Sequence, residues 1–157
     1  MRRSIILLAC GAAFACGGGE IAVVAMTCDE ITADLAARKA DMISTPSGLM
    51  YEELATGRGP AAEAGQHVYT HYVLCSEDGQ EIDSSLAPDR GVPLDFDLGT
   101  GAMIDGYDEG VRGMKAGERR ILVLPPAIAY GGQTLPGQAP GSDLIFYVQL
   151  MSIGVPE

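Results

Sequence analysis

Hydrophobic and polar residues alternate in several short stretches of the chain, and this pattern predicts a protein built mainly of β-strands. The clearest stretch is residues 66–75, where every second side chain would share one face of a strand. These side chains are Val68, Thr70, Tyr72 and Leu74. A last strand alternates in the same way through Leu144, Phe146, Val148 and Leu150. Further strands are predicted at residues 49–55, 80–83, 93–98 and 119–124.

One stretch has helical spacing instead. Its apolar stripe predicts a short amphipathic helix, and it consists of Ile104, Tyr107, Val111 and Met114. The strand at 119–124 shows little alternation, which indicates a central place in a sheet. Twenty-one glycines and nine prolines favour short strands and many turns, including one at residues 56–60. The predicted fold class is therefore α+β, with an antiparallel sheet wrapped around one short helix.

The N-terminus has the pattern of an export signal. Arg2 and Arg3 precede an uncharged run of apolar and small residues that is too short to span a membrane. Small residues at Ala13 and Ala15 precede Cys16, so we expect residues 1–15 to be a signal peptide. The stretch ending at Cys16 also resembles a bacterial lipobox, in which the cysteine is lipidated. Cys10 is a second candidate but would leave a very short apolar region. We expect an exported protein, periplasmic or in the envelope, that is either soluble or lipid-anchored at Cys16.

Residues 16–45 are predicted to be a tether, beginning with three glycines. Residues 29–43 have helical spacing and predict one short helix at most. This helix could pack on the domain or form part of the spacer. A break at residues 45–48 separates the tether from the domain, which is predicted to cover residues 46–154.

The charge of the chain argues against two classes of partner. Removing residues 1–15 would leave 8 of the 10 basic side chains against 21 acidic ones, a net charge of −13. Such a surface repels nucleic acid and anionic lipid headgroups. We therefore expect no nucleic-acid partner, and contact with a membrane only through a lipid anchor.

Two cysteines would remain after export and lipidation. Cys28 and Cys75 could pair in an oxidising compartment, or they could remain two separate thiols. Their spacing fits no zinc pattern.

Few residues are candidates for catalysis or metal binding. His67 and His71 would lie about 13 Å apart on a strand, too far to share one zinc, and are predicted to be surface residues. Ser84 and Ser85 beside Asp83 match no hydrolase motif and are interpreted as a turn. The adjacent Asp108 and Glu109 are interpreted as a charged helix face. No cofactor or metal site emerges.

Taken together, residues 46–154 resemble the FKBP-type peptidyl-prolyl cis-trans isomerases, the macrolide-binding immunophilins. Single matches are weak, but many occur in order and at near-constant spacing. They include His71-Tyr72, Asp83-Ser84-Ser85, Gly117-Glu118-Arg119, Ala129-Tyr130-Gly131 and Leu144-Ile145-Phe146. The resemblance implies a cleft between sheet and helix that accelerates rotation of X-Pro bonds. It also implies a monomer that uses no cofactor and binds proline-containing polypeptides and macrolides.

Carried over by position, the resemblance implies a set of site residues. The catalytic set comprises Tyr72, Asp83, Ile104, Tyr107, Tyr130 and Phe146. The substrate-binding set comprises Ile82, Leu94, Met103 and Leu135, with Gln138 as the alternative to Leu135.

Three positions depart from the family pattern. Tyr107 replaces a frequent Trp, and Ile82 and Leu94 replace two Phe residues. A wider and more polar cleft is therefore expected. These changes keep open a proline-binding chaperone module with little catalysis, and more remotely a purely structural envelope lipoprotein.

Overall fold

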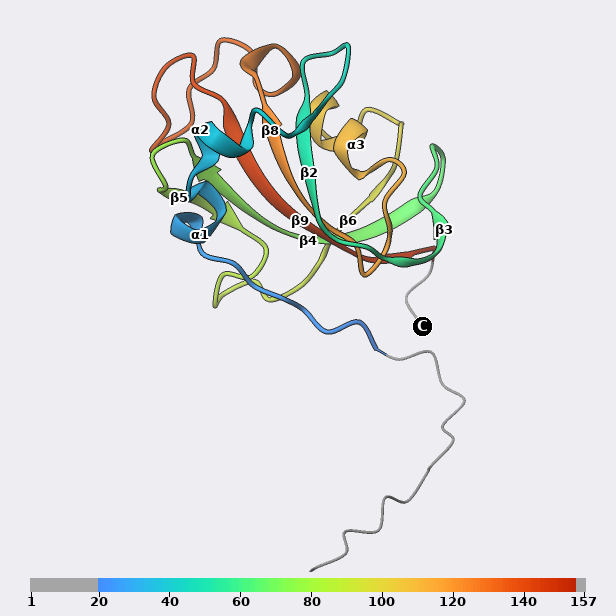
Figure 1. Ribbon diagram of the computed structural model, residues 1–157. Coiled ribbons are helices and arrows are strands. Elements are labelled where there is room, and N and C mark those ends of the chain that lie inside the picture. The colour runs from blue at the N-terminus through green and yellow to red at the C-terminus, as the bar shows by residue number, and fades with distance from the viewer. Residues whose placement is uncertain (1–19, 155–157) are drawn as a thin grey trace, which may run out of the picture.

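The computed structural model describes residues 20–154 and contains a seven-stranded antiparallel sheet with both faces covered (Figure 1). The order along the sheet is β1-β2-β8-β9-β4-β5, and β6 also pairs with β4. Its strands are β1 (Ile43–Ser44), β2 (Met50–Ala55), β4 (His67–Ser76), β5 (Glu81–Ser84), β6 (Leu94–Asp97), β8 (Arg119–Leu124) and β9 (Leu144–Ile153). The signal peptide predicted at residues 1–15 and the lipidation predicted at Cys16 lie outside the described residues.

The predicted α+β class and antiparallel sheet are confirmed. The strands β2, β4, β5, β6, β8 and β9 lie close to their predicted bounds, and β8 is central as expected. The turn predicted at residues 56–60 is wrong in part, because β3 (Arg58–Ala61) pairs with β7 (Lys115–Ala116) in a small second sheet. Pairing over so few residues leaves no readable alternation in the sequence.

The inner face of the sheet packs against α3 (Asp105–Val111), which is shorter than the apolar stripe from which it was predicted. Helix and sheet approach closely at Gly106 and Gly110, which have no Cβ. A Cβ there would lie within 2.6 Å of a side-chain atom of Leu124 or Leu122, respectively. Arg120 of β8 anchors the end of the helix, since its guanidinium donates to the Gly110 carbonyl at 3.0 Å. The helix is thereby fixed over β8 and β9.

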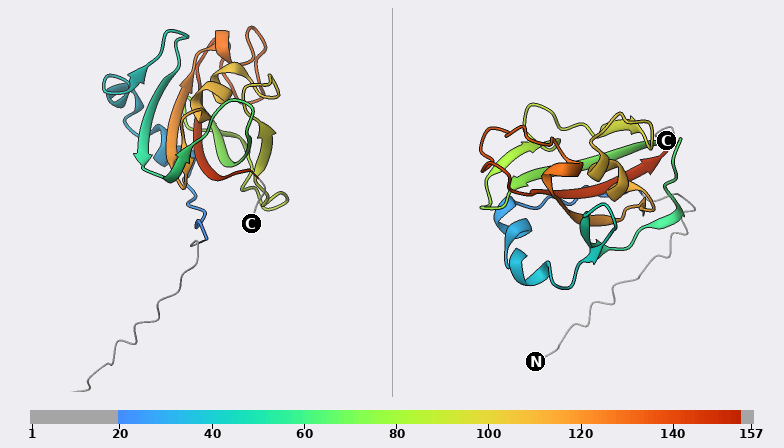
Figure 2. Two further views of the ribbon diagram at one scale, coloured as in Figure 1. Left: turned by 90° about the vertical axis from the view of Figure 1, so that its right-hand side faces the viewer. Right: turned by 90° about the horizontal axis from the view of Figure 1, so that it is seen from above.

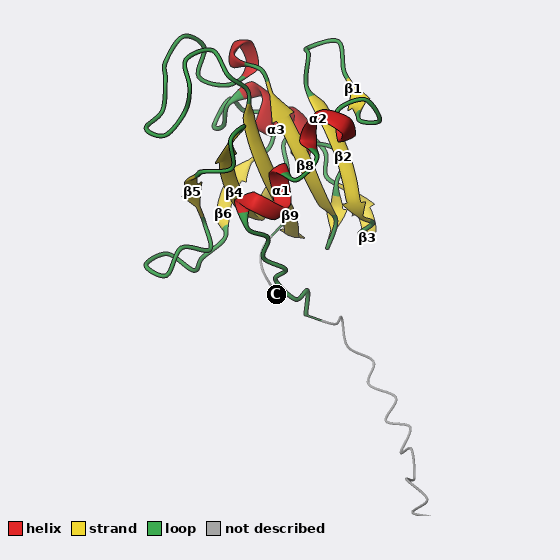
Figure 3. Cartoon of the chain, turned by 60° about the vertical axis from the view of Figure 1, so that its left-hand side comes forward, coloured by secondary structure: helices red, strands yellow, loops and turns green. Residues whose placement is uncertain are grey.

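The outer face is covered by the N-terminal segment, in which α1 (Cys28–Thr32) and α2 (Leu35–Arg38) replace the single helix predicted at 29–43. These helices and α3 lie on opposite sides of the sheet, and α1 crosses β4 and β9 (Figures 2 and 3). Thr27 and Glu30 form a capping box at the start of α1. Of the two options for this segment, packing on the domain is the one observed.

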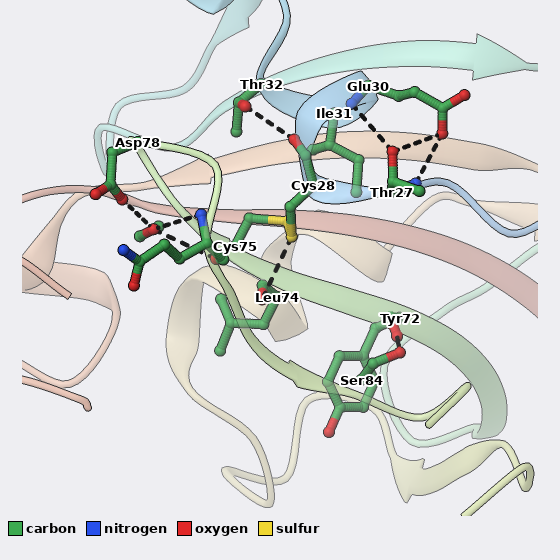
Figure 4. The surroundings of a disulfide bond; sticks show 12 residues. Thr27, Cys28, Glu30, Ile31, Thr32, Tyr72, Leu74, Cys75, Asp78 and Ser84 are labelled. Carbon is green, nitrogen blue, oxygen red and sulfur yellow. Dashed lines mark hydrogen bonds between the residues drawn. A yellow bond between two sulfur atoms is a disulfide. The ribbon is translucent and has the colours of Figure 1, made fainter. Parts of the chain in front are cut away.

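A disulfide joins this cover to the sheet, so of the two options left open for the two cysteines the pair is the one observed. Cys28 at the start of α1 is bonded to Cys75 of β4, with Cα atoms 5.6 Å apart (Figure 4). Around it lies a second apolar cluster, distinct from that under α3. Its members are Cys28, Ile31, Leu35, Met42, Val73, Cys75, Ile121, Val123, Ile145 and Tyr147.

Residues before α1 are also held on the outer face, by side chains of β9. The Gln149 carboxamide accepts from the Val24 amide at 2.9 Å and donates to the Ala22 carbonyl at 2.8 Å. The Tyr147 hydroxyl donates to the Val24 carbonyl at 2.6 Å. Residues 22–24 are thus held on the sheet by side-chain hydrogen bonds and do not add a strand to it.

The prediction that both histidines lie at the surface is wrong for His71. Its side chain points to the outer face, as predicted, but it is buried there and bonds Ser85 Oγ at 3.0 Å. Burial lowers the pKa of His71. His67 remains partly exposed and bonds Asp97 at 2.6 Å. The spacing of residues around His71 does not indicate that this part of the sheet would be covered.

No helix within residues 20–154 is long and apolar enough to cross a membrane.

Candidate active site

Aromatic rings from β4, β6, α3 and β9 meet beneath the helix. The Tyr107 ring is at the centre, with ring centroids 5.2 Å from Phe146, 5.9 Å from Phe96 and 6.2 Å from Tyr72. The Tyr107–Phe146 and Tyr72–Tyr107 pairs are edge-to-face, an arrangement that aromatic quadrupoles favour. Tyr107 is completely buried, whereas Tyr72 is partly exposed. Solvent therefore reaches the cluster at Tyr72 and not at Tyr107.

Partly exposed apolar side chains pack against the inner core that contains the Tyr107, Phe96 and Phe146 rings. Those from the predicted sets are Ile82, Leu94, Met103, Ile104 and Leu135. The structure thus brings these residues together with Tyr72, Tyr107 and Phe146, although they come from distant parts of the sequence. A hollow of about 420 Å³ also adjoins Met103, but its other walls include Asp105, Asp108 and Glu109. Its carboxylates make it unsuited to an apolar ring, so the aromatic cluster is the stronger candidate.

A hydrogen-bonded group of Tyr72, Asp83 and Arg90 borders the aromatic cluster. The Tyr72 hydroxyl donates to Asp83 Oδ2 at 2.6 Å, and Arg90 Nη1 lies 3.0 Å from Asp83 Oδ1. Burial, and then the bond to Asp83, raise the pKa of Tyr72 to about 12. At neutral pH Tyr72 is therefore a protonated donor, and Asp83 is held between a phenol and a guanidinium.

Arg90 is a site residue that the sequence did not reveal. It lies in the polar loop between β5 and β6, where no periodicity marks an inward residue. The start of this loop is pinned to β4, because Ser85 Oγ accepts from the Tyr72 amide at 2.9 Å. Asp83 and Ser84 end β5, and the predicted turn begins only at Ser85, where the Leu86 amide donates to Ser84 Oγ at 3.0 Å.

Two further groups could contact a peptide backbone. Ile104 is the N-cap residue of α3, and its amide donates to no acceptor within residues 20–154. Tyr130 follows the short 3-10 helix η1 (Pro126–Ile128) and is 40% exposed. Its neighbours Ile128 and Ala129 pack against the inner core, but Tyr130 itself pairs with no ring of the aromatic cluster within residues 20–154.

The interpretation of Asp108 and Glu109 as a charged face is wrong for Asp108. Asp108 is 7% exposed, and its carboxylate accepts from the Gly99 amide at 2.6 Å and from Arg112 at 3.0 Å. It fixes the loop before α3 to the helix.

Within the described part of the chain, no three His, Cys, Asp or Glu side chains gather to hold a metal ion.

Comparisons with known proteins bear on the same residues. A family model described as FKBP-type peptidyl-prolyl cis-trans isomerase matches residues 59–151. The FK506-binding protein of Streptomyces anulatus is 44% identical over 111 residues, which cover 69% of this chain and 88% of that protein. FK506-binding protein 4 of Mycosarcoma maydis is 41% identical over 127 residues, 81% of this chain, but this match spans only 33% of that protein.

A solved structure agrees with the sequence matches. The crystal structure of FkpA from Escherichia coli superposes with a TM-score of 0.63 at 30% identity, covering 81% of this chain and 62% of that one. At this identity and coverage the two chains share the fold.

Proposed function

The chain belongs to the family of FKBP-type peptidyl-prolyl cis-trans isomerases, and we propose that it accelerates rotation about X-Pro bonds of other polypeptides. The observation that carries this proposal is the aromatic cluster of Tyr107, Phe146 and Tyr72 with its apolar rim. This cluster offers a surface for a proline ring.

Rotation about an X-Pro bond needs an apolar site that excludes water, and it needs no proton transfer. Rotation about a peptide bond has a barrier of about 18–20 kcal/mol because it breaks amide resonance. For X-Pro bonds the two planar states are close in energy and interconvert slowly. The twisted amide has less charge separation than the planar one. A site that replaces water by apolar side chains therefore favours the twisted state.

Each side chain of the site has a proposed role. Tyr107, Phe146 and Ile104 enclose the proline ring, while Ile82, Leu94, Met103 and Leu135 form the walls. The Tyr130 hydroxyl and the Ile104 amide hold substrate carbonyls. Asp83, supported by Arg90, orients the Tyr72 hydroxyl beside the rotating bond. Macrolides with a comparable apolar ring would compete for the same surface.

We also propose that the protein is exported, with residues 1–15 removed and Cys16 lipidated, and that it acts as a monomer. The Cys28–Cys75 disulfide supports export, because such bonds persist in oxidising compartments. Mass spectrometry of the mature N-terminus tests this: a lipid on Cys16 is expected, and a chain that keeps Met1 would contradict it.

An isomer-coupled assay on the processed protein tests the catalytic proposal. We expect Phe146→Ala to lower kcat/KM by about 100-fold and Tyr130→Phe by about fivefold, since each removes a contact to the proline or its carbonyl. Ile145→Ala is the matched control, because Ile145 is the next residue of β9 and packs on the outer face. Wild-type turnover at the uncatalysed rate would contradict the proposal.

The partly exposed aliphatic rim also supports a second function, a chaperone that grips proline-containing segments. Ile82 and Leu94 offer binding area without the rigid ring faces that aromatic side chains would supply. Suppression of client aggregation by a protein without isomerase activity would favour this alternative.

A further inference from the structure

Thr70 is a polar residue on the inner face of β4, between Val68 and Tyr72, and it is completely buried. Its Oγ1 lies 2.8 Å from the Tyr107 hydroxyl and 3.4 Å from the Leu94 carbonyl oxygen. A carbonyl oxygen can only accept, so Thr70 donates to Leu94 and accepts from Tyr107. The two hydroxyls form one chain from the ring at the centre of the site to the strand that carries a wall residue.

The sheet is irregular at this position. Tyr69 is opposite Ser152 of β9, but Thr70 is opposite Leu150, so the register shifts between them. On its other edge β4 pairs with β6, where Thr70 is opposite Leu94. Register shifts of this kind re-aim side chains, and they often adjoin functional sites. Thr70 therefore lies where β4 contacts both the irregular part of β9 and the edge strand β6.

The Tyr107 hydroxyl needs this partner. The rings of Tyr72, Phe96 and Phe146 hold the Tyr107 ring from the side, but none of them bonds its hydroxyl. A buried hydroxyl without a partner is unfavourable, so the ring would shift toward solvent. The partly exposed residues Tyr72 and Leu94 show that solvent lies on the side of the site. A shifted ring would enter the space that the proline is proposed to occupy.

We propose that Thr70 is a positioning residue of the prolyl site: by bonding both Tyr107 and Leu94, it fixes the floor ring against the β6 wall and sets the depth available to the proline. This inference rests on the proposed isomerase function. Tyr107 stands where the family frequently has Trp, and its hydroxyl needs a hydrogen-bond partner in the core. Thr70 is that partner.

The test is a double-mutant cycle on the processed protein. Thr70→Val keeps the shape and removes the hydroxyl, and it should lower kcat/KM by about tenfold, mainly through a higher KM. Thr70→Ser keeps the hydroxyl and should restore most of the activity. In the Tyr107→Phe background no hydroxyl is left without a partner, so Thr70→Val should change kcat/KM by less than about twofold.

Val73→Ala is the matched control, because Val73 lies on the outer face of the same strand. It should lower the free energy of unfolding and leave KM unchanged. An unchanged KM in Thr70→Val, an equal KM rise in Val73→Ala, or an equal loss in the Tyr107→Phe background would each overturn the proposal. Wild-type protein without isomerase activity would overturn the function instead. The same cycle measured on the free energy of unfolding would then show whether the contact is structural alone.

Discussion

The two faces of the sheet are built from alternate residues of the same strands, yet they differ in what covers them. The inner face is covered by α3, which lies between β6 and β8 in the chain, and it carries the aromatic site. The outer face is covered by residues 20–42, which precede the whole sheet in sequence. Its cover consists of aliphatic contacts, side-chain bonds to backbone and a disulfide.

This difference indicates a division between activity and stability. The helices α1 and α2 contain five and four residues, too few to persist in water without tertiary contacts. The disulfide attaches α1 to β4, and the Gln149 contacts attach the segment before α1 to β9. The inner face, in contrast, has partly exposed rings and hydroxyls that can contact a ligand. We expect changes on the outer face to alter unfolding and changes on the inner face to alter catalysis.

The largest effect that tests this division is expected from Cys28→Ala combined with Cys75→Ala. The disulfide closes a loop between residues 47 positions apart, and its removal should lower the free energy of unfolding by about 4 kcal/mol. Urea unfolding measures this loss, and kcat/KM of the folded protein should remain within about twofold of wild type.

Wild-type protein under reducing conditions is the control for the two substitutions, and its stability should fall toward that of the double variant. Cys75 is close to Tyr72 along β4 (Figure 4). A large fall in kcat/KM in the folded double variant would therefore contradict the division between activity and stability. It would show that contacts on the outer face position the site on the inner face.

The next largest effect is expected from Gln149→Ala. This change removes two hydrogen bonds to the segment before α1, and the free energy of unfolding should fall by about 2 kcal/mol. Hydrogen exchange at the Val24 amide should accelerate in the same variant. Gln133→Ala, at an exposed loop position, is the control. Equal stability of the two variants would show that the segment is held by its apolar contacts alone.

A smaller effect on the inner face is expected from Tyr72→Phe. The change removes the hydroxyl that bonds Asp83, and kcat/KM should fall by about fivefold with little change in unfolding. Tyr69→Phe is the matched control on the other face of β4. Because the pKa of Tyr72 is about 12, its hydroxyl keeps its proton near neutrality. Its contribution should therefore not vary with pH in that range.

The inner face was predictable because its signals are local. Alternation in β4 and β9 and the helical stripe at Tyr107 identify the inward side chains without knowledge of their partners. The cover of the outer face was not predictable, since it depends on contacts between residues far apart in sequence. His71 was placed at the surface for that reason, whereas Asp108 was placed there because its bond to the Gly99 amide leaves no mark in the spacing.

The predicted site shows the same limit. The resemblance supplied Tyr72, Tyr107 and Phe146, which the structure brings together. It did not supply Arg90, which lies in a loop without periodicity, or Thr70, whose importance follows from a hydroxyl on Tyr107. Both were missed because their roles depend on a partner side chain that no spacing reveals.

The smallest effect is expected at His67, at the uncovered end of the outer face. Its Nδ1 lies 2.6 Å from Asp97, and this bond, with the nearby Asp95, raises the pKa of His67. The folded protein therefore binds the proton more tightly than the unfolded chain. The resulting stability is complete below the ordinary histidine pKa of about 6.5 and is lost as pH rises through the raised value.

Comparison of wild type with His67→Gln isolates this contribution. His71 acts in the opposite sense, because burial lowers its pKa and its contribution is lost as pH falls, but it is present in both proteins. The difference in thermal midpoint should be greatest near pH 5.5 and vanish by about pH 9. It should be small because solvent screens exposed ion pairs. A difference that stays constant across this range would mean that His67 acts by packing against Tyr69 and not by charge.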